Sequence, residues 1–145
     1  MQIMIYALAL ICLFVTLYDF RYRRVPNEIT LPLLLTGILT NFPGAPDLWM
    51  GSILLLVAWG SGGMGAGDVK LWMALLWCTF PVFGERVVWV MFITLVITSV
   101  VQIIVRILMK KRDVTGIKLP GAWRALVYLI FLIFYTIGGA SYVRL

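Results

Sequence analysis

The sequence contains no histidine, and this absence excludes several kinds of enzyme site. Ser-His-Asp and Cys-His nucleophile chemistry both need an imidazole as the general base. The usual zinc sites need histidine or clustered cysteine. The two cysteines, Cys12 and Cys78, lie in separate apolar segments and form neither a CxxC pair nor a ligand cluster. We therefore expect buried thiols, no metal and no cofactor.

Charged residues are also scarce, at 12% of the 145 residues, whereas soluble domains contain about 25%. Hydrophobic residues make up 63% of the chain, and its mean hydropathy is +1.04. Such a chain has too few charged side chains to build a water-exposed surface. The sequence therefore predicts an all-α, polytopic membrane protein with a single domain over residues 1–145.

Turn residues divide the chain into about six apolar segments. The predicted spans cover residues 2–18, 28–42, 48–62, 68–83, 87–108 and 122–142. The second to fourth segments are short for a spanning helix, which needs about 17–25 residues. We expect neighbouring helices and thinned lipid to shield their ends. Short helices around a polar site also suit an intramembrane active site that water can reach.

The distribution of basic residues predicts the orientation of the chain. If the loops alternate between two sides, ten of the twelve Lys and Arg residues fall on one side, and many of these ten lie in a late connector. Arg86 and Arg144 fall on the other side. Cytoplasmic loops carry such an excess, so we expect both termini on the non-cytoplasmic side. The net charge of +6 then reflects topology and contacts with lipid headgroups. No nucleic-acid partner is expected, because base-reading motifs are absent.

This orientation places two aspartates at the same depth. The first segment ends at Asp19 on the cytoplasmic side, and the fourth begins at Asp68 on that side. A carboxylate among apolar segments is costly unless it is paired, hydrated or functional. Two facing carboxylates can support aspartyl proteolysis without metal or histidine, since one takes a proton from water while the other polarises the scissile carbonyl.

The same residues also allow structural roles and another function. Asp68 could be the N-cap of the fourth helix, and Asp19 could form an i,i+4 ion pair with Arg23. Asn27 could cap the second helix, or Pro26 could end the loop before it. Ion and proton pathways also use intramembrane acids. A small proton- or ion-coupled transporter is therefore the alternative function.

Helix dipoles give a hypothesis for the roles of the two aspartates. Asp68 would lie at a helix N-terminus, where an anion is favoured, and Asp19 at a C-terminal end, where it is disfavoured. This predicts Asp68 as the base and Asp19 as the acid, although the arginines after Asp19 oppose it. The glycine-rich run at residues 62–67 is expected to leave room for a substrate backbone.

Two motifs in the chain resemble those of the type IV prepilin peptidases. Residues 65–70 read GAGDVK, which matches the GxGDxK pattern of that family. Residues 19–27 read DFRYRRVPN, which resembles its first-aspartate motif of Asp, basic residues and aliphatic-Pro-Asn. The resemblance covers nearly the whole chain and implies that Asp19 and Asp68 are the catalytic pair. The supporting motif residues that it implies are Gly65, Gly67, Lys70, Arg23, Pro26 and Asn27.

The resemblance implies a membrane-embedded aspartyl endopeptidase of the inner (cytoplasmic) membrane, with its active site on the cytoplasmic side. Its partner would be a prepilin or pseudopilin, cut after the glycine that ends a short basic leader. The product would enter a type IV pilus, type II secretion or tight-adherence system. Larger members carry an added domain with paired CxxC motifs, linked to N-methylation. This chain lacks that insert and resembles the small Flp-type or archaeal preflagellin peptidases, so we expect cleavage without methylation.

Overall fold

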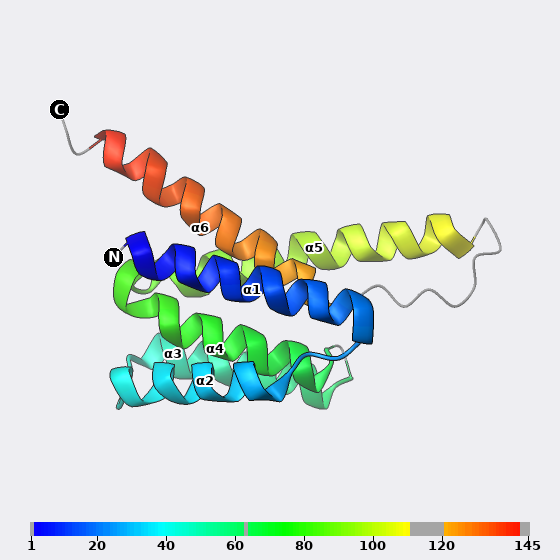
Figure 1. Cartoon of the computed structure of the whole chain (residues 1–145), viewed down its shortest axis with the longest axis horizontal. Coiled ribbons are helices and arrows are strands. Elements are labelled where there is room, and N and C mark those ends of the chain that lie inside the picture. The colour runs from blue at the N-terminus through cyan, green and yellow to red at the C-terminus, as the bar shows by residue number, and fades with distance from the viewer. Residues whose placement is uncertain (1, 63, 111–120, 143–145) are drawn as a thin grey trace.

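Six helices make up the computed structural model, which describes residues 2–62, 64–110 and 121–142 (Figure 1). The described residues contain no strand, and their helices are α1 (Gln2–Tyr22), α2 (Asn27–Asn41), α3 (Pro46–Gly60), α4 (Ala66–Phe83), α5 (Arg86–Lys110) and α6 (Trp123–Tyr142). The prediction of an all-α fold with six helices is confirmed, and each helix overlaps its predicted segment. Gly63 and most of the basic connector, at residues 111–120, lie outside the described residues.

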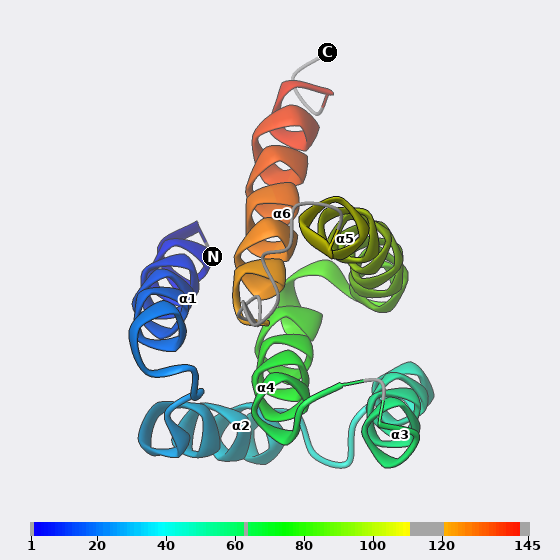
Figure 2. The ribbon, with the colours of Figure 1, turned by 90° about the vertical axis from the view of Figure 1, so that its right-hand side faces the viewer.

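Helix α4 is the centre of the fold. It packs against α2, α3 and α5, and it also contacts α6. Its large side chains form much of the core and are almost fully buried: Leu71, Trp72, Leu75, Leu76 and Trp77. Helix α1 lies to one side, where its main partner is α6 (Figure 2). The first and fourth helices, which carry the two aspartates, therefore meet chiefly through α6.

Helix α1 is longer than its apolar sequence predicts. The apolar run ends near Tyr18, but the helix continues through Tyr22, so Asp19 lies in its last turns rather than in a loop. The rings of Tyr18 and Tyr22, one turn apart, pack with their centroids 4.5 Å from each other. The helix ends at Arg23, whose φ of 54° breaks the helical backbone. Hydropathy locates the end of the apolar run, whereas the backbone locates the end of the helix.

The turn after α3 depends on one glycine. The N–H of Gly62 donates to the carbonyl of Trp59, and the N–H of Met64 donates to that of Ala58. Gly62 has φ +76°, the left-handed conformation that ends many helices and that glycine adopts without a steric penalty. This turn reverses the chain between α3 and α4.

The outer faces of the helices are apolar. Large side chains such as Leu10, Leu17, Ile53, Val57 and Val96 are more than half exposed, whereas soluble monomers rarely expose such contiguous patches. Two segments, Ile3–Tyr22 and Arg86–Val105, are long and apolar enough to cross a membrane. Pro46–Gly60 and Trp123–Thr136 are shorter apolar helices. The 15 residues of α2 extend about 22 Å, which is less than the roughly 30 Å of a hydrocarbon core.

Candidate active site

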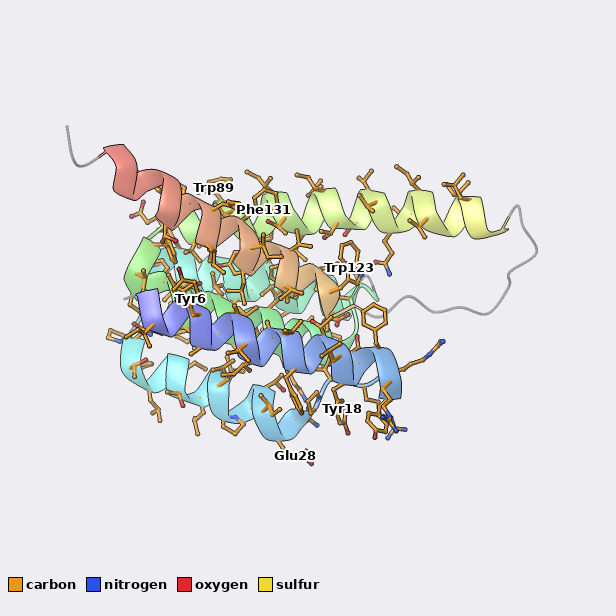
Figure 3. The ribbon with its side chains drawn as sticks, turned by 45° about the horizontal axis from the view of Figure 1, so that its top comes forward. Tyr6, Tyr18, Glu28, Trp89, Trp123 and Phe131 are labelled. Atoms are coloured by element: carbon orange, nitrogen blue, oxygen red, sulfur yellow. The ribbon has the colours of Figure 1, made fainter. Side chains whose placement is uncertain are left out.

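A cavity of about 560 Å³ lies where α1, the α1–α2 loop, the first turn of α4 and the start of α6 meet. Figure 3 shows Tyr18 near the end of α1 and Trp123 at the start of α6, at this end of the molecule. The cavity is lined by charged, amide and small residues: Asp19, Arg23, Arg24, Val25, Asn27, Gly65, Ala66, Gly67, Asp68, Lys70 and Gly121. It therefore brings together the two predicted aspartates and all of the supporting residues except Pro26.

Asp19 is bound to the start of α6. Its side chain is only 5% exposed, and Oδ2 accepts hydrogen bonds from the N–H groups of Gly121 at 3.0 Å and Ala122 at 3.2 Å. The first N–H groups of a helix have no partner within the helix, and its positive end favours an anion. No ion pair joins Asp19 to Arg23 in the described part of the chain, so that alternative role is not observed.

Asp68 lies in the first turn of α4 and is not its N-cap. The helix begins at Ala66, the N-cap position is Gly65, and no side chain caps this end. The N-cap interpretation is therefore wrong, because the helix starts two residues earlier than the apolar sequence indicates. The half-buried carboxylate of Asp68 interacts electrostatically with Arg124 and Asp19.

Both carboxylates meet at Gly121. A Cβ atom on Gly121 would lie only 2.5 Å from Cγ of Asp68 and closer still to both of its carboxylate oxygens. The same residue donates its N–H to Asp19. One peptide at the start of α6 thus touches the two acids, which belong to different helices.

The two sequence motifs contact each other directly. A Cβ atom on Gly67 would lie 2.9 Å from Cβ of Val25, so the first turn of α4 packs closely on the α1–α2 loop. Nearby, Lys70 Nζ donates to Asn27 Oδ1 at 3.3 Å. By contrast, a Cβ atom on Gly65 would meet only Asp68 Oδ2, at an ordinary 3.6 Å. Close packing therefore requires the second glycine of the GxGD motif but not the first.

Pro26 and Asn27 have distinct places at the start of α2. Pro26 is buried at the N-cap position, and its carbonyl accepts bonds from the N–H of Thr30 at 3.2 Å and from Thr30 Oγ1 at 3.0 Å. Asn27 is the first helical residue and no side chain caps the helix, so the prediction of Asn27 as N-cap is wrong. Its amide oxygen turns toward Lys70 instead. Glu28 is exposed and points away from the helices (Figure 3).

The start of α6 contains the site residues that the sequence did not reveal. Gly121 and Ala122 bind Asp19 through their backbone, which no side-chain pattern can report. Arg124 interacts with Asp68, and its Nη1 donates to Ser99 Oγ at 3.4 Å. In the sequence Arg124 counts only as a cytoplasmic positive charge. The sequence contained one signal for this part of the site: Gly121 stands just before the last apolar segment, and Arg124 lies in the first turn of that segment.

One of the comparisons with known proteins identifies a family. The model of the type IV leader peptidase family matches residues 6–107. The chain belongs to this family. The match includes Asp19 and Asp68, and it supports a membrane-associated, prepilin-type peptidase in general terms. It ends before α6, so Gly121 and Arg124 lie outside it. No curated protein and no solved structure matches the chain.

Proposed function

We propose that this leader peptidase is a membrane-embedded aspartyl endopeptidase that cuts the short basic leader from prepilins or pseudopilins, after a glycine. The observation that carries the proposal is the meeting of Asp19 and Asp68 at Gly121, in the wall of one cavity. The family match favours a peptidase over an ion-coupled transporter. Gly65, Gly67, Lys70, Arg23, Pro26 and Asn27 then support the catalytic pair.

The chemistry requires one proton shared between the two acids, because two close carboxylates resist ionising together. The ionised carboxylate takes a proton from water, and the water oxygen attacks the scissile carbonyl carbon. The protonated partner polarises the carbonyl oxygen. When the C–N bond breaks, the leaving amine receives a proton from the pair.

Helix ends no longer distinguish the acid from the base. Asp68 lies at the N-terminal end of α4, as the sequence predicts. Asp19, however, lies against the N-terminal end of α6 as well as near the C-terminal end of α1. Both carboxylates thus have a positive helix end beside them. Helix dipoles therefore do not favour Asp68 over Asp19 as the base.

We place this peptidase in the inner membrane, with six spans in a single domain over residues 1–145 and both termini outside. Arg23, Arg24 and Lys70 line the same cavity as the aspartates. Basic residues in short loops favour the cytoplasmic side. A cytoplasmic leader would then reach the two acids while its adjoining hydrophobic helix stays in lipid.

The test is co-expression with a prepilin in a host that has no prepilin peptidase of its own. The prepilin carries a short basic leader, a glycine and a hydrophobic helix, and cleavage is read by gel shift and by the mass of the new N-terminus. Wild type and the matched control Asp47→Asn, at the far end of α3, should cleave. Asp19→Asn and Asp68→Asn should accumulate in the membrane without cleaving.

Two results would contradict the proposal. The first is an unshifted prepilin with wild type, tested with several such leaders. The second is cleavage by both Asp→Asn variants. An ion or proton flux in proteoliposomes that depends on the two aspartates, without any processing, would support the transporter instead.

A further inference from the structure

The start of α6 touches both catalytic candidates although it belongs to neither sequence motif. We propose that Gly121 is a positioning residue, which sets the separation of Asp19 and Asp68 by fitting its peptide between them. This inference rests on the proposed function, since it assigns Gly121 a role in the same reaction. It extends the site to α6, which lies outside the family match.

On one side, α1 binds this peptide at two points. Asp19 Oδ2 accepts the N–H groups of Gly121 and Ala122. One turn earlier, Thr16 Oγ1 donates to the carbonyl of Cys12 at 2.7 Å and lies 3.4 Å from the carbonyl of Ala122. Thr16 and Asp19 are both buried, and hydrogen bonds that a carboxylate accepts from backbone N–H groups are stronger than bonds between neutral groups. The carboxylate of Asp19 is therefore fixed relative to residue 121.

On the other side, Asp68 lies against the bare Cα of Gly121. Any Cβ atom there would overlap the carboxylate. Gly121 does not have the positive φ seen at Gly44, Gly62 and Gly84, so the need for glycine is one of space rather than backbone conformation. Among the glycines whose surroundings the structure describes, Gly121 alone would place a Cβ atom within 3 Å of a carboxylate.

The packing of the helices explains why the contact at Gly121 controls the distance between the two acids. Helix α1 packs mainly on α6, whereas α4 packs mainly on α2 and α3. The distance between the two acids therefore depends on how the first turn of α6 fits against α4. Arg124, in the same turn as Gly121, adds an electrostatic attraction to Asp68. A side chain at residue 121 would push Asp68 away from Asp19 although no residue of either motif is substituted.

The test compares Gly121→Ala with wild type on a purified prepilin in detergent or nanodiscs. A misplacement of about 1 Å in a catalytic group can cost about 100-fold in rate. We expect kcat to fall by about that factor while KM stays within about twofold, because the substitution acts on the reacting groups. The pH–rate profile should also change shape, since the two carboxylates interact at a different separation.

The matched control is Gly60→Ala, because a Cβ atom there has no neighbour within 4 Å. It should leave kcat and KM unchanged. A Gly121→Ala enzyme with kcat within about threefold of wild type would overturn the proposal. So would an equal loss in Gly60→Ala.

A double-mutant cycle keeps the proposal testable if Gly121→Ala does not fold well. We expect Gly121→Ala to lower the thermal unfolding midpoint when Asp68 is present and to leave it unchanged in an Asp68→Ala background, where the clashing carboxylate is gone. Equal losses in both backgrounds would refute the contact. If wild type fails to cleave any prepilin, the proposed function fails, whereas this cycle still reports on Gly121.

Discussion

The two glycines of the GxGD motif should respond differently to the same substitution. Alanine at Gly67 would place its Cβ atom 2.9 Å from Cβ of Val25 and 3.2 Å from its Cγ2. Carbon atoms pack best at about 3.5–4.0 Å, so the first turn of α4 must move by roughly 0.6–1 Å away from the α1–α2 loop. Asp68 is the next residue and would move with it.

The magnitudes follow from these distances. Overpacking of this kind costs about 1–3 kcal/mol, while alanine in a helix gains up to about 1 kcal/mol over glycine. We therefore expect Gly67→Ala to lose up to about 2 kcal/mol of unfolding free energy. Because a misplacement of about 1 Å can cost about 100-fold in rate, kcat should fall by up to that factor. Gly65→Ala should stay within about threefold of wild type, since its Cβ atom meets only an ordinary contact.

The assay measures prepilin cleavage rates and chemical denaturation of both variants in the same detergent. A double variant that combines Gly67→Ala with Val25→Gly gives a second check. Val25→Gly removes the Cβ atom with which the alanine at residue 67 would clash. The double variant should recover part of the rate that Gly67→Ala loses. Equal effects of Gly65→Ala and Gly67→Ala, or no recovery with Val25→Gly, would refute the packing argument.

Four further substitutions test other parts of the structure. Lys70→Met removes the exposed bond to Asn27 and should cost only about 1 kcal/mol of unfolding free energy, so a loss of more than about 2 kcal/mol would contradict this account of the contact. Gly62→Ala places a side chain at φ +76° and should cost about 1–2 kcal/mol in denaturation while leaving kcat unchanged, and a large kcat loss would instead assign Gly62 to the substrate site. In a cysteine-free background, Arg24→Cys should react with a membrane-impermeant maleimide only after the cells are opened and Glu85→Cys should react in intact cells, and the reverse pattern would invert the proposed topology.

Position along the helix bundle is the property that the sequence predicts best. Hydropathy located all six helices, and the basic residues assigned Asp19 and Asp68 to one side. Both quantities vary along a single direction, from one end of the bundle to the other. They carry no information about which helices are neighbours, and so they could not show that α6 lies between the two acids.

Helix boundaries were predicted less well, for a related reason. The start of α4 at Ala66 and the end of α1 at Tyr22 lie in stretches where glycine, tyrosine and arginine replace aliphatic residues. Hydropathy falls there, but the backbone stays helical. At the start of α4, a boundary error of two residues decided whether Asp68 was interpreted as a cap. Asp19 stays near the C-terminal end of α1, and its interpretation changed because of its contact with α6.

The glycines show most clearly what tertiary contacts add. In the sequence, the run at residues 62–67 indicated room for a substrate backbone. Gly62 instead shapes the turn after α3, and the space beside Gly67 is filled by Val25. Gly121, which is distant in sequence, provides the close approach between backbone and carboxylate. Gly65 and Gly67 nevertheless line the cavity of about 560 Å³, a volume within the 300–1,000 Å³ common for ligand sites. That the run leaves room for a substrate therefore stays a prediction.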